Sequence, residues 1–473
     1  MKVLEKPISR RGFMKKGFQF AGTAALMAII VACIARLPGL DLPQAEAAGK
    51  GAVVSAAAGW STNPSPIKAG AEAAAMAKKT VKKPTFAIVF ASPPYKDFDS
   101  LLAGVASVIG SDVRTVGQTT GYGGGYSIGP AGFIPKSVVV LLLESKYLKV
   151  GIGLGTGCKA NPREAAKKAT LAAIKDLNYN PWKDLRKVKP GPALLKHAPY
   201  SVMMMDDGYA GVADHEILGI QDVIGWAPLV GGCAGDDGSL GKSLQFFGGK
   251  AYDDAIVITI FSGPVKMGYG CGISYKPVAG KFGVVTGGDG FRQIYEIDGK
   301  PAGKVWLKWS GAPEEHVLTK HIQPYNQWWP IGVQEHLYPE WIWIKDPALY
   351  IKEKNGLGVG GITPLGTTVH LLEATPDTII EGNIKSLKDA LNYEGVTKVA
   401  AAIAFNCVER LTILQTEKGK TEENFDKMMD VLGHPAIAGN GGAWGEQMFA
   451  PTGNIGMQNM TLTTLIISDE LLR

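Results

Sequence analysis

The sequence predicts an α+β fold of mixed sheets flanked by helices. Short apolar runs of the length of a buried strand recur along the chain, and helix-like stretches and glycine-rich segments follow several of them. With 46% apolar residues among 473, the chain can bury a substantial core. Its length indicates two or three domains at about 150 residues each.

The first of three similar units begins with the apolar run 86–91, which is typical of a buried strand. The rest of this unit reads as helix, short strand, glycine-rich segment, strand and strand, at 101–109, 113–116, 117–125, 137–143 and 149–155. The second unit has the corresponding segments 201–205, 217–223, 230–238, 255–261 and 265–272. The third is looser, with 401–405, 425–432, 438–442 and 460–467. The fold is therefore expected to consist of repeated strand-helix-strand-glycine loop-strand-strand units.

Between the second and third units, 284–286 and 291–297 are strand-like, and Asp298-Gly299 is a turn signal. The following stretch is rich in tryptophan: Trp306, Trp309, Trp328, Trp329, Trp341 and Trp343. It has no helical periodicity. An aromatic plug between domains is favoured over an aromatic wall for a ligand.

The N-terminus has the features of an export signal. Ser9-Arg10-Arg11-Gly12-Phe13-Met14-Lys15 resembles the twin-arginine motif, an apolar stretch follows at 18–34, and Ala45-Glu46-Ala47 is a suitable cleavage site. We expect a twin-arginine signal peptide at 1–47 and a periplasmic or cell-surface protein. A lipidated Cys33 or an uncleaved leader stays open, and membrane association is expected only through one of these. Residues 48–83, rich in Ala, Gly, Ser, Pro and Lys, are predicted to be a flexible tether with a short helix at 71–79.

Charge and cysteine usage exclude several classes of protein. The net charge is +6, but no basic stripe with interleaved aromatic residues is present, so nucleic-acid binding is not expected. The five cysteines form no C-x-x-C pair, and the seven histidines form no H-x-x-x-H pattern, so no metal site is predicted. The glycines of 151–157 miss the G-x-G-x-x-G register of a dinucleotide loop. Asp206-Asp207-Gly208 fits a cation ligand or a simple turn.

Several segments together resemble the FIST family. They are 228–237 (PLVGGCAGDD), 295–302 (YEIDGKPA), 405–410 (FNCVER), Gly445-Glu446 and 458–461 (QNMT). The resemblance covers about 85–468 and implies a FIST N-terminal domain at 84–322 and a C-terminal domain at 323–470. The chain departs from the family pattern at Asn406, where Ser is usual, and at Ala443-Trp444. The family occurs in sensory and signal-transduction proteins that bind small ligands, proposed to include amino acids, and some similar proteins bind haem and sense nitric oxide.

The candidate ligand-binding residues lie where strands end. Gly231 and Gly232 begin a glycine-rich segment whose N–H groups would attract an anion, and Asp236 and Asp237 would hold a cationic group; turn chemistry alone explains them equally well. Three further candidates follow the third unit's strands: Cys407, Arg410 and Glu446. Arg410 can hold a carboxylate with its bidentate fork, or form an ion pair with Glu409 or Glu446.

These observations favour a small-molecule sensor that passes a signal to a separate partner and is not an enzyme. No catalytic residues are assigned, because no full triad is legible. Two alternatives stay open: a haem-binding sensor of nitric oxide, with one histidine as axial ligand, and a hydrolase that uses Cys407.

Overall fold

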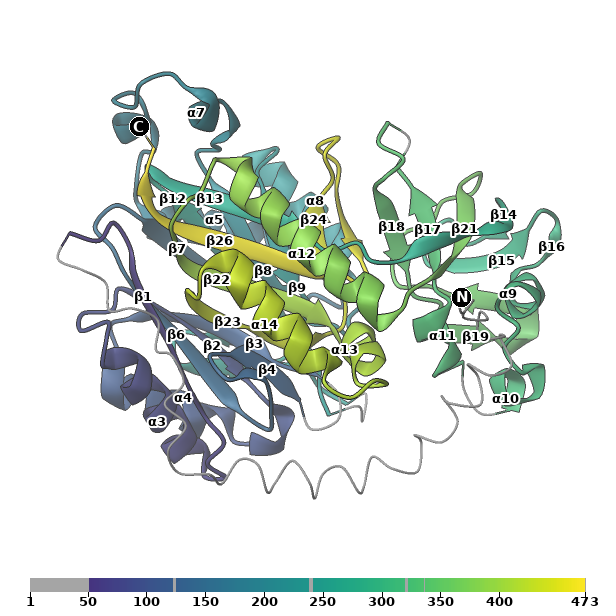
Figure 1. Ribbon diagram of the computed structural model, residues 1–473, viewed down its shortest axis with the longest axis horizontal. Coiled ribbons are helices and arrows are strands. Elements are labelled where there is room, and N and C mark those ends of the chain that lie inside the picture. The colour runs from purple at the N-terminus through teal and green to yellow at the C-terminus, as the bar shows by residue number, and fades with distance from the viewer. Residues whose placement is uncertain (1–50, 122–124, 238–240, 320–321, 336, 473) are drawn as a thin grey trace, which may run out of the picture.

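The computed structural model describes residues 51–121, 125–237, 241–319, 322–335 and 337–472 (Figure 1). This part of the chain forms three six-stranded sheets and one eight-stranded sheet, together with the helices that cover them. Parallel and antiparallel pairs occur within one sheet, so the predicted α+β class with mixed sheets is confirmed. The predicted twin-arginine leader, its cleavage site and Cys33 lie outside the described residues.

Each six-stranded sheet contains one parallel pair of strands, and the first strand of that pair also has an antiparallel neighbour. The first sheet runs β1 (Ser55–Ser61), β6 (Val138–Glu144), β2 (Phe86–Ala91), β3 (Arg114–Thr119), β10 (Gln245–Phe247) and β11 (Lys250–Tyr252). The second runs β25 (Ile455–Gln458), β24 (Glu446–Phe449), β9 (Leu229–Gly232), β8 (Ser201–Asp206), β12 (Ala255–Ser262) and β7 (Lys149–Thr156). The third runs β13 (Val265–Cys271), β26 (Leu462–Leu471), β22 (Val399–Cys407), β23 (Ala436–Ala443), β4 (Tyr126–Gly129) and β5 (Gly132–Pro135).

Helices cover the outer face of each of these sheets, and the apolar side of each helix packs on the strands. In order of the sheets they are α3 (Pro66–Lys78) with α4 (Phe98–Ile109), α5 (Pro162–Leu177) with α8 (Ala213–Ile224), and α12 (Pro376–Tyr393) with α14 (Lys420–Leu432). The start of α12 shows how the sequence sets these ends. Thr375 forms a capping box with Thr378, and Pro376 occupies the first turn, where its missing N–H costs nothing.

The inner faces of the three sheets pack against one another and form the central core. Phe90 of the first sheet meets Phe405 of the third edge-on, with ring centroids 5.8 Å apart. Phe86 of the first sheet makes the same kind of contact with Phe261 of the second, also at 5.8 Å. The core is therefore shared by all three sheets, which explains why their apolar strands are buried on both faces.

Three hairpins join the sheets by crossing between them. The strands β4 and β5 follow β3 of the first sheet but pair with β23 of the third. Likewise β10 and β11 follow β9 of the second sheet and pair with β3, while β24 and β25 follow β23 and pair with β9. Each sheet thus receives a hairpin from another, and the segments after β3, β9 and β23 all lead toward the shared interior.

The eight-stranded sheet forms a lobe on the right of Figure 1. Its strands are β18 (Ile342–Lys345), β17 (Ile331–Gln334), β21 (Thr368–Glu373), β14 (Lys276–Gly288), β15 (Gln293–Ile297), β20 (Gly356–Gly358) and β19 (Leu349–Ile351), with β16 (Lys300–Pro301) beside β15. Its helices are α9 (Ala302–Ser310), α10 (Glu314–Thr319) and α11 (Tyr325–Trp328), and short 3-10 helices lie here at Lys352–Lys354 and in the first sheet's region at Pro93–Tyr95. Trp306, on α9, is fully buried in the core of this lobe and donates its ring N–H to the Trp329 carbonyl at 2.8 Å.

Two predictions about chain organisation differ from the structure. The predicted boundary between residues 322 and 323 falls inside the lobe, and the third sheet combines strands from both sides of it. Within the predicted tether 48–83, the described residues 51–83 are not a flexible linker, because Ser55–Ser61 pairs with β6 and Pro66–Lys78 is a helix. The small residues allow close packing there: a Cβ at Gly59 would lie 2.2 Å from the carbonyl oxygen of Ala73. None of the described helices has the length and apolarity needed to cross a bilayer.

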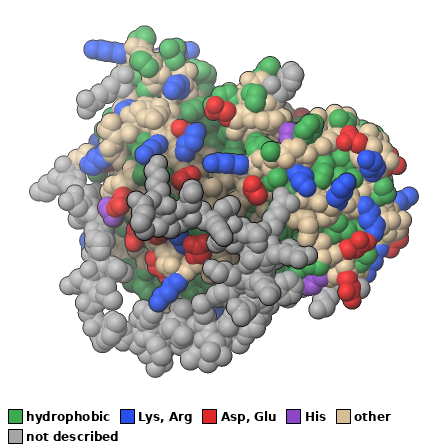
Figure 2. Space-filling view, turned by 45° about the vertical axis from the view of Figure 1, so that its right-hand side comes forward, with side chains coloured by type: hydrophobic (Ala, Val, Ile, Leu, Met, Phe, Trp, Pro, Cys, Tyr) green, Lys and Arg blue, Asp and Glu red, His purple; other side chains and the backbone are tan. Residues whose placement is uncertain are grey.

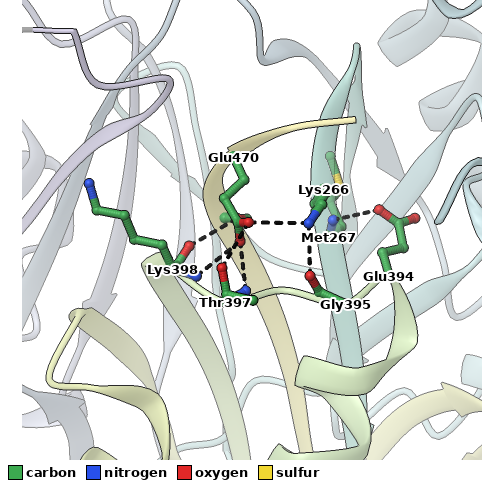
Figure 3. Close-up of polar contacts among 8 residues, drawn as sticks. Lys266, Met267, Glu394, Gly395, Thr397, Lys398 and Glu470 are labelled. Atoms are coloured by element: carbon green, nitrogen blue, oxygen red, sulfur yellow. Dashed lines mark hydrogen bonds and ion pairs between the residues drawn. The ribbon is translucent and has the colours of Figure 1, made fainter. Parts of the chain in front are cut away.

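The end of the last strand is fastened to its neighbours by Glu470 (Figure 3). Its carboxylate accepts hydrogen bonds from the N–H groups of Thr397 and Lys398 at 2.6 and 2.9 Å, and pairs with Lys266 at 3.2 Å. Two short helices, α6 (Trp182–Leu185) and α7 (Pro192–Lys196), project near this end of the body (Figure 1).

Candidate ligand-binding site

The glycine-rich ends of β3, β9 and β23 meet in the interior. The Gly235 N–H donates to the Thr119 carbonyl at 3.3 Å, and the Asn440 side-chain amide donates to the Cys233 carbonyl at 3.3 Å. A Cβ at Gly442 would lie 2.2 Å from the Gly121 carbonyl oxygen, so glycine is required for this approach. Segments far apart in the sequence are therefore held in one place.

Strand pairing brings three of the predicted site residues together at this junction. Glu446 on β24 lies opposite Gly232 on β9, and Gln447 lies opposite Gly231. A Cβ at Gly232 would stand 2.6 Å from the Cβ of Phe405, on the strand that ends at Cys407. The absence of a side chain at Gly232 thus allows the second and third sheets to approach each other closely.

The backbone N–H groups of the glycine segment donate hydrogen bonds within the protein and are not free to bind an anion. Gly231 and Gly232 belong to a strand, not to a turn. The N–H groups of Cys233, Ala234 and Gly235 donate to the carbonyls of Gly445, Asp206 and Thr119 at 2.8, 2.8 and 3.3 Å. These described residues therefore do not form the anion-binding nest that the glycine pattern suggests.

Arg410 lies on α13 (Val408–Leu414) with no exposed surface. One terminal nitrogen, Nη2, donates to Ser274 Oγ at 3.2 Å, to the Ile379 carbonyl at 3.4 Å and to Asn383 Oδ1. The other two nitrogens, Nε and Nη1, have no hydrogen-bond partner among the described residues. A buried guanidinium with unused donors is costly, since an unmade hydrogen bond to a charged group loses more than about 1–3 kcal/mol.

Glu446 is the matching buried acid. Its Oε2 accepts from the N–H and hydroxyl of Thr461 at 3.1 and 2.9 Å, whereas Oε1 has no partner in the described part of the chain. Burial raises the pKa of Glu446 well above its usual value, and the nearby Arg410 opposes this rise. Among the described residues no ion pair joins Arg410 to Glu446 or to Glu409, so neither ion-pair partner predicted for Arg410 is found. Arg410 and Glu446 are thus both buried, and each keeps hydrogen-bonding atoms without a partner among the described residues.

Cys407 lies beside this pair, but its environment makes the thiol unreactive. Its thiol donates to Glu409 Oε2 at 2.8 Å. Burial first, and then the charges of Glu409 and Glu446, raise the pKa of the Cys407 thiol well above its ordinary value. Because the thiolate is the nucleophile, this environment disfavours covalent chemistry at Cys407.

Asp236 and Asp237 serve a different region. Asp236 accepts hydrogen bonds from the Tyr209 hydroxyl and, at 2.7 Å, from the Gly241 N–H. Asp237 forms an ion pair of 3.3 Å with Lys96, whose side chain is largely exposed. Both contacts fasten the loop after β9 to its surroundings.

A second buried polar cluster adjoins the junction, and the sequence pointed to only part of it. Asp206, which ends β8, accepts from the Gln447 amide at 3.0 Å and from the Cys233 thiol at 3.3 Å. Burial raises the pKa of Asp206 to about 7, and burial likewise raises the pKa of its neighbour Glu216. The available signal for Glu216 was an acid among the apolar positions of α8, whose buried residues include Ala213, Ile217 and Ile220. In the described residues, no group of three or more His, Cys, Asp or Glu side chains is placed to hold a metal ion.

An open hollow of about 610 Å³ lies on the surface beside α5. His215, one of its wall residues, stacks on Phe291 with ring centroids 4.9 Å apart. The other walls include Lys159, Arg163 and Asp222, which are charged, whereas a haem requires a mostly apolar pocket. The residues of this hollow therefore do not fit haem.

Two individual proteins are similar to parts or most of this chain. An uncharacterized protein of Methanocaldococcus jannaschii is 32% identical over 120 residues, and the match covers 23% of this chain and 22% of that protein. The chain therefore matches less than a quarter of the length of this curated relative. A crystal structure of a cyanuric acid hydrolase from A. caulinodans is similar with a TM-score of 0.35 and 10% identity, over 88% of this chain and 99% of that chain.

The family comparison covers most strands of the first two sheets and the start of the lobe, but not β1, β24 or β25. Residues 85–300 match the model of the FIST N domain. The matched range includes Gly231, Gly232 and Asp206, whereas Arg410 and Glu446 lie beyond it. The match to the FIST N domain thus runs from β2 through β15.

Proposed function

We propose that the protein is a sensor that binds a small zwitterion, such as an amino acid, at Arg410 and Glu446 without transforming it. The FIST N domain supports a small-molecule-sensing role. The observation that carries the ligand class is a buried guanidinium and a buried carboxyl group with unused hydrogen-bonding atoms: Nε and Nη1 of Arg410 and Oε1 of Glu446.

The chemistry of these atoms selects the ligand. The unused Nε and Nη1 of Arg410 lie on different edges of the guanidinium, so each would donate to its own acceptor, and a carboxylate oxygen is a charge-matched acceptor for either N–H group. An ammonium group would donate to Glu446 Oε1 and favour its ionised form. An amino acid carries both groups on one carbon, so it would satisfy both ends of the site together.

Binding without turnover is supported by the state of Cys407. The hydrolase alternative needs a thiolate and a base, whereas the Cys407 thiol is paired with the carboxylate of Glu409 and its pKa is raised. We therefore place Cys407 next to the ligand as a lining residue.

Export and signalling belong to the same proposal. The twin-arginine motif at 9–15 would carry the folded protein across the cytoplasmic membrane, and a separate partner protein would receive the signal. Fractionation of cells that express wild type or Arg10→Lys/Arg11→Lys tests this directly. Retention of the variant in the cytoplasm is expected, and export of both proteins would contradict the proposed route.

Calorimetric titration with the common amino acids tests the ligand class. Arg410→Met roughly keeps the side-chain volume and removes the guanidinium, Glu446→Gln removes the acid, and Arg163→Met on the surface is the matched control. We expect binding to be lost in the first two variants and kept in the third. Binding that persists in both Arg410→Met and Glu446→Gln would show that the ligand lies elsewhere.

A further inference from the structure

The segment 178–200, which contains α6 and α7, has an unusual surface. It carries five cations, all exposed, against a single carboxylate, Asp184. Two large apolar side chains are also exposed within it: Trp182 at 54% and Leu195 at 88%. Figure 2 shows hydrophobic and basic side chains side by side at the top of the molecule, the end at which Figure 1 places α7. Exposed tryptophan and leucine among cations is a combination typical of surfaces that meet a membrane interface.

The base of this segment is held firmly by the body. His197 contacts the Glu394 carboxylate at 3.0 Å, and the Ser262 hydroxyl donates to the Pro199 carbonyl at 2.7 Å. Lys196 lies over the ring of Tyr393, 5.9 Å from its centroid. The exposed side chains therefore project from a fixed support.

The N-terminal residues enter the described fold at the same end. The N–H groups of Val53 and Val54 donate to Asp469 at 2.6 and 3.0 Å, next to Glu470. Figure 3 shows Glu470 joined to Lys266, and Glu394 joined to the neighbouring Met267; Glu394 also contacts His197. The segment 178–200 and the point where residues 1–50 join the body thus share one face.

From the charge, the exposed apolar side chains and this shared face, we propose that the segment 178–200 docks on an anionic membrane surface. Lys183, Arg186 and Lys189 would meet lipid phosphates, while Trp182 and Leu195 would enter the headgroup layer. The body would then stand on the membrane by the end at which the chain enters it.

Cosedimentation of the full chain with vesicles tests this docking surface. One set of vesicles is phosphatidylcholine alone, and the other contains added phosphatidylglycerol. We expect tighter binding to the anionic vesicles, weakened by salt. Lys183→Gln/Arg186→Gln/Lys189→Gln should weaken it roughly a hundredfold, since each cation near an anionic surface contributes about fivefold. Trp182→Ser and Leu195→Ser should each weaken it roughly tenfold.

Matched control variants distinguish vesicle binding through the segment 178–200 from binding through the overall charge or through the leader. Lys68→Gln/Lys308→Gln/Lys418→Gln removes three exposed cations elsewhere, and Leu337→Ser removes a leucine that is 77% exposed. Both should bind like wild type, and unchanged thermal midpoints establish that each variant is folded. Equal binding to both vesicle types, or equal binding by the segment variants and the controls, overturns the proposal. Self-association abolished by Leu195→Ser, without vesicle binding, would instead assign this surface to a second copy of the chain and also overturn it.

Discussion

Replacing Glu470 with glutamine should destabilise the protein in a pH-dependent way. The carboxylate accepts from two backbone N–H groups and from the hydroxyls of Thr397 and Ser468, at 2.6–3.0 Å, and pairs with Lys266. Glutamine keeps the size of the side chain but puts an NH₂ group where donors converge. These contacts together lower the pKa of Glu470 to about 2 from 4.5, against the effect of its partial burial.

The size of the effect follows from this pKa. Lowering the pKa from 4.5 to about 2 corresponds to roughly 3.5 kcal/mol, at about 1.4 kcal/mol for each pH unit. The side chain is 23% exposed. Allowing for solvent screening, we expect a loss of about 2 kcal/mol in the free energy of unfolding at neutral pH. Because the folded pKa is lowered, the stabilisation is complete above pH 4.5 and is lost as the pH falls toward 2.

Urea unfolding of wild type and Glu470→Gln at several pH values measures this difference. Glu422→Gln, at an exposed position, is the matched control and should unfold like wild type. We expect the difference in the free energy of unfolding between wild type and Glu470→Gln to shrink by more than half between neutral pH and about pH 3. A gap that is zero at neutral pH, or constant across the range, would refute this explanation of the strand end.

Two further substitutions and one labelling experiment have defined outcomes. Gly232→Ala should lower stability by about 1–3 kcal/mol, because its Cβ would overlap Phe405; a thermal midpoint equal to wild type would contradict the close approach of the sheets. Trp306→Ala should cost about 3–5 kcal/mol, measured by urea unfolding, because the indole fills the lobe core; a loss below 1 kcal/mol would show that the lobe repacks. Cys407 should react slowly with iodoacetamide at mildly alkaline pH, since its pKa is raised; labelling as fast as a free thiol would indicate an exposed thiolate.

Local patterns predicted the strands of the core well. The apolar runs 86–91, 201–205, 255–261 and 401–405 all lie within strands that are buried throughout or nearly so. Apolar runs of this length are informative because they can be buried only at the centre of a sheet or within a core. The exchange of hairpins was not predictable, because the pairing of Glu446 with Gly232 joins residues more than two hundred positions apart.

Composition misled where small residues pack closely. The segment 48–83 has the alanine and glycine content of a linker, yet Ala69, Ala73 and Ala77 are fully buried where α3 lies on β1. The sequence motifs also grouped into one candidate site residues that lie in two different parts of the structure. Glu446 and Gly232 are neighbours and Arg410 faces the same interior, whereas Asp236 and Asp237 fasten a loop. Glu216 was missed because an acid on an apolar helix face has no motif of its own.

The most direct test of the account is whether the bound amino acid displaces a proton from Glu446. In the free protein burial raises the pKa of Glu446 and so favours its protonated form, whereas an ammonium beside it would favour the ionised form. Calorimetry in two buffers of different ionisation enthalpy should show proton release on binding, with affinity that rises with pH, and Glu446→Gln should show neither. Tight binding without proton release, or unchanged binding by Glu446→Gln, would contradict the proposed site.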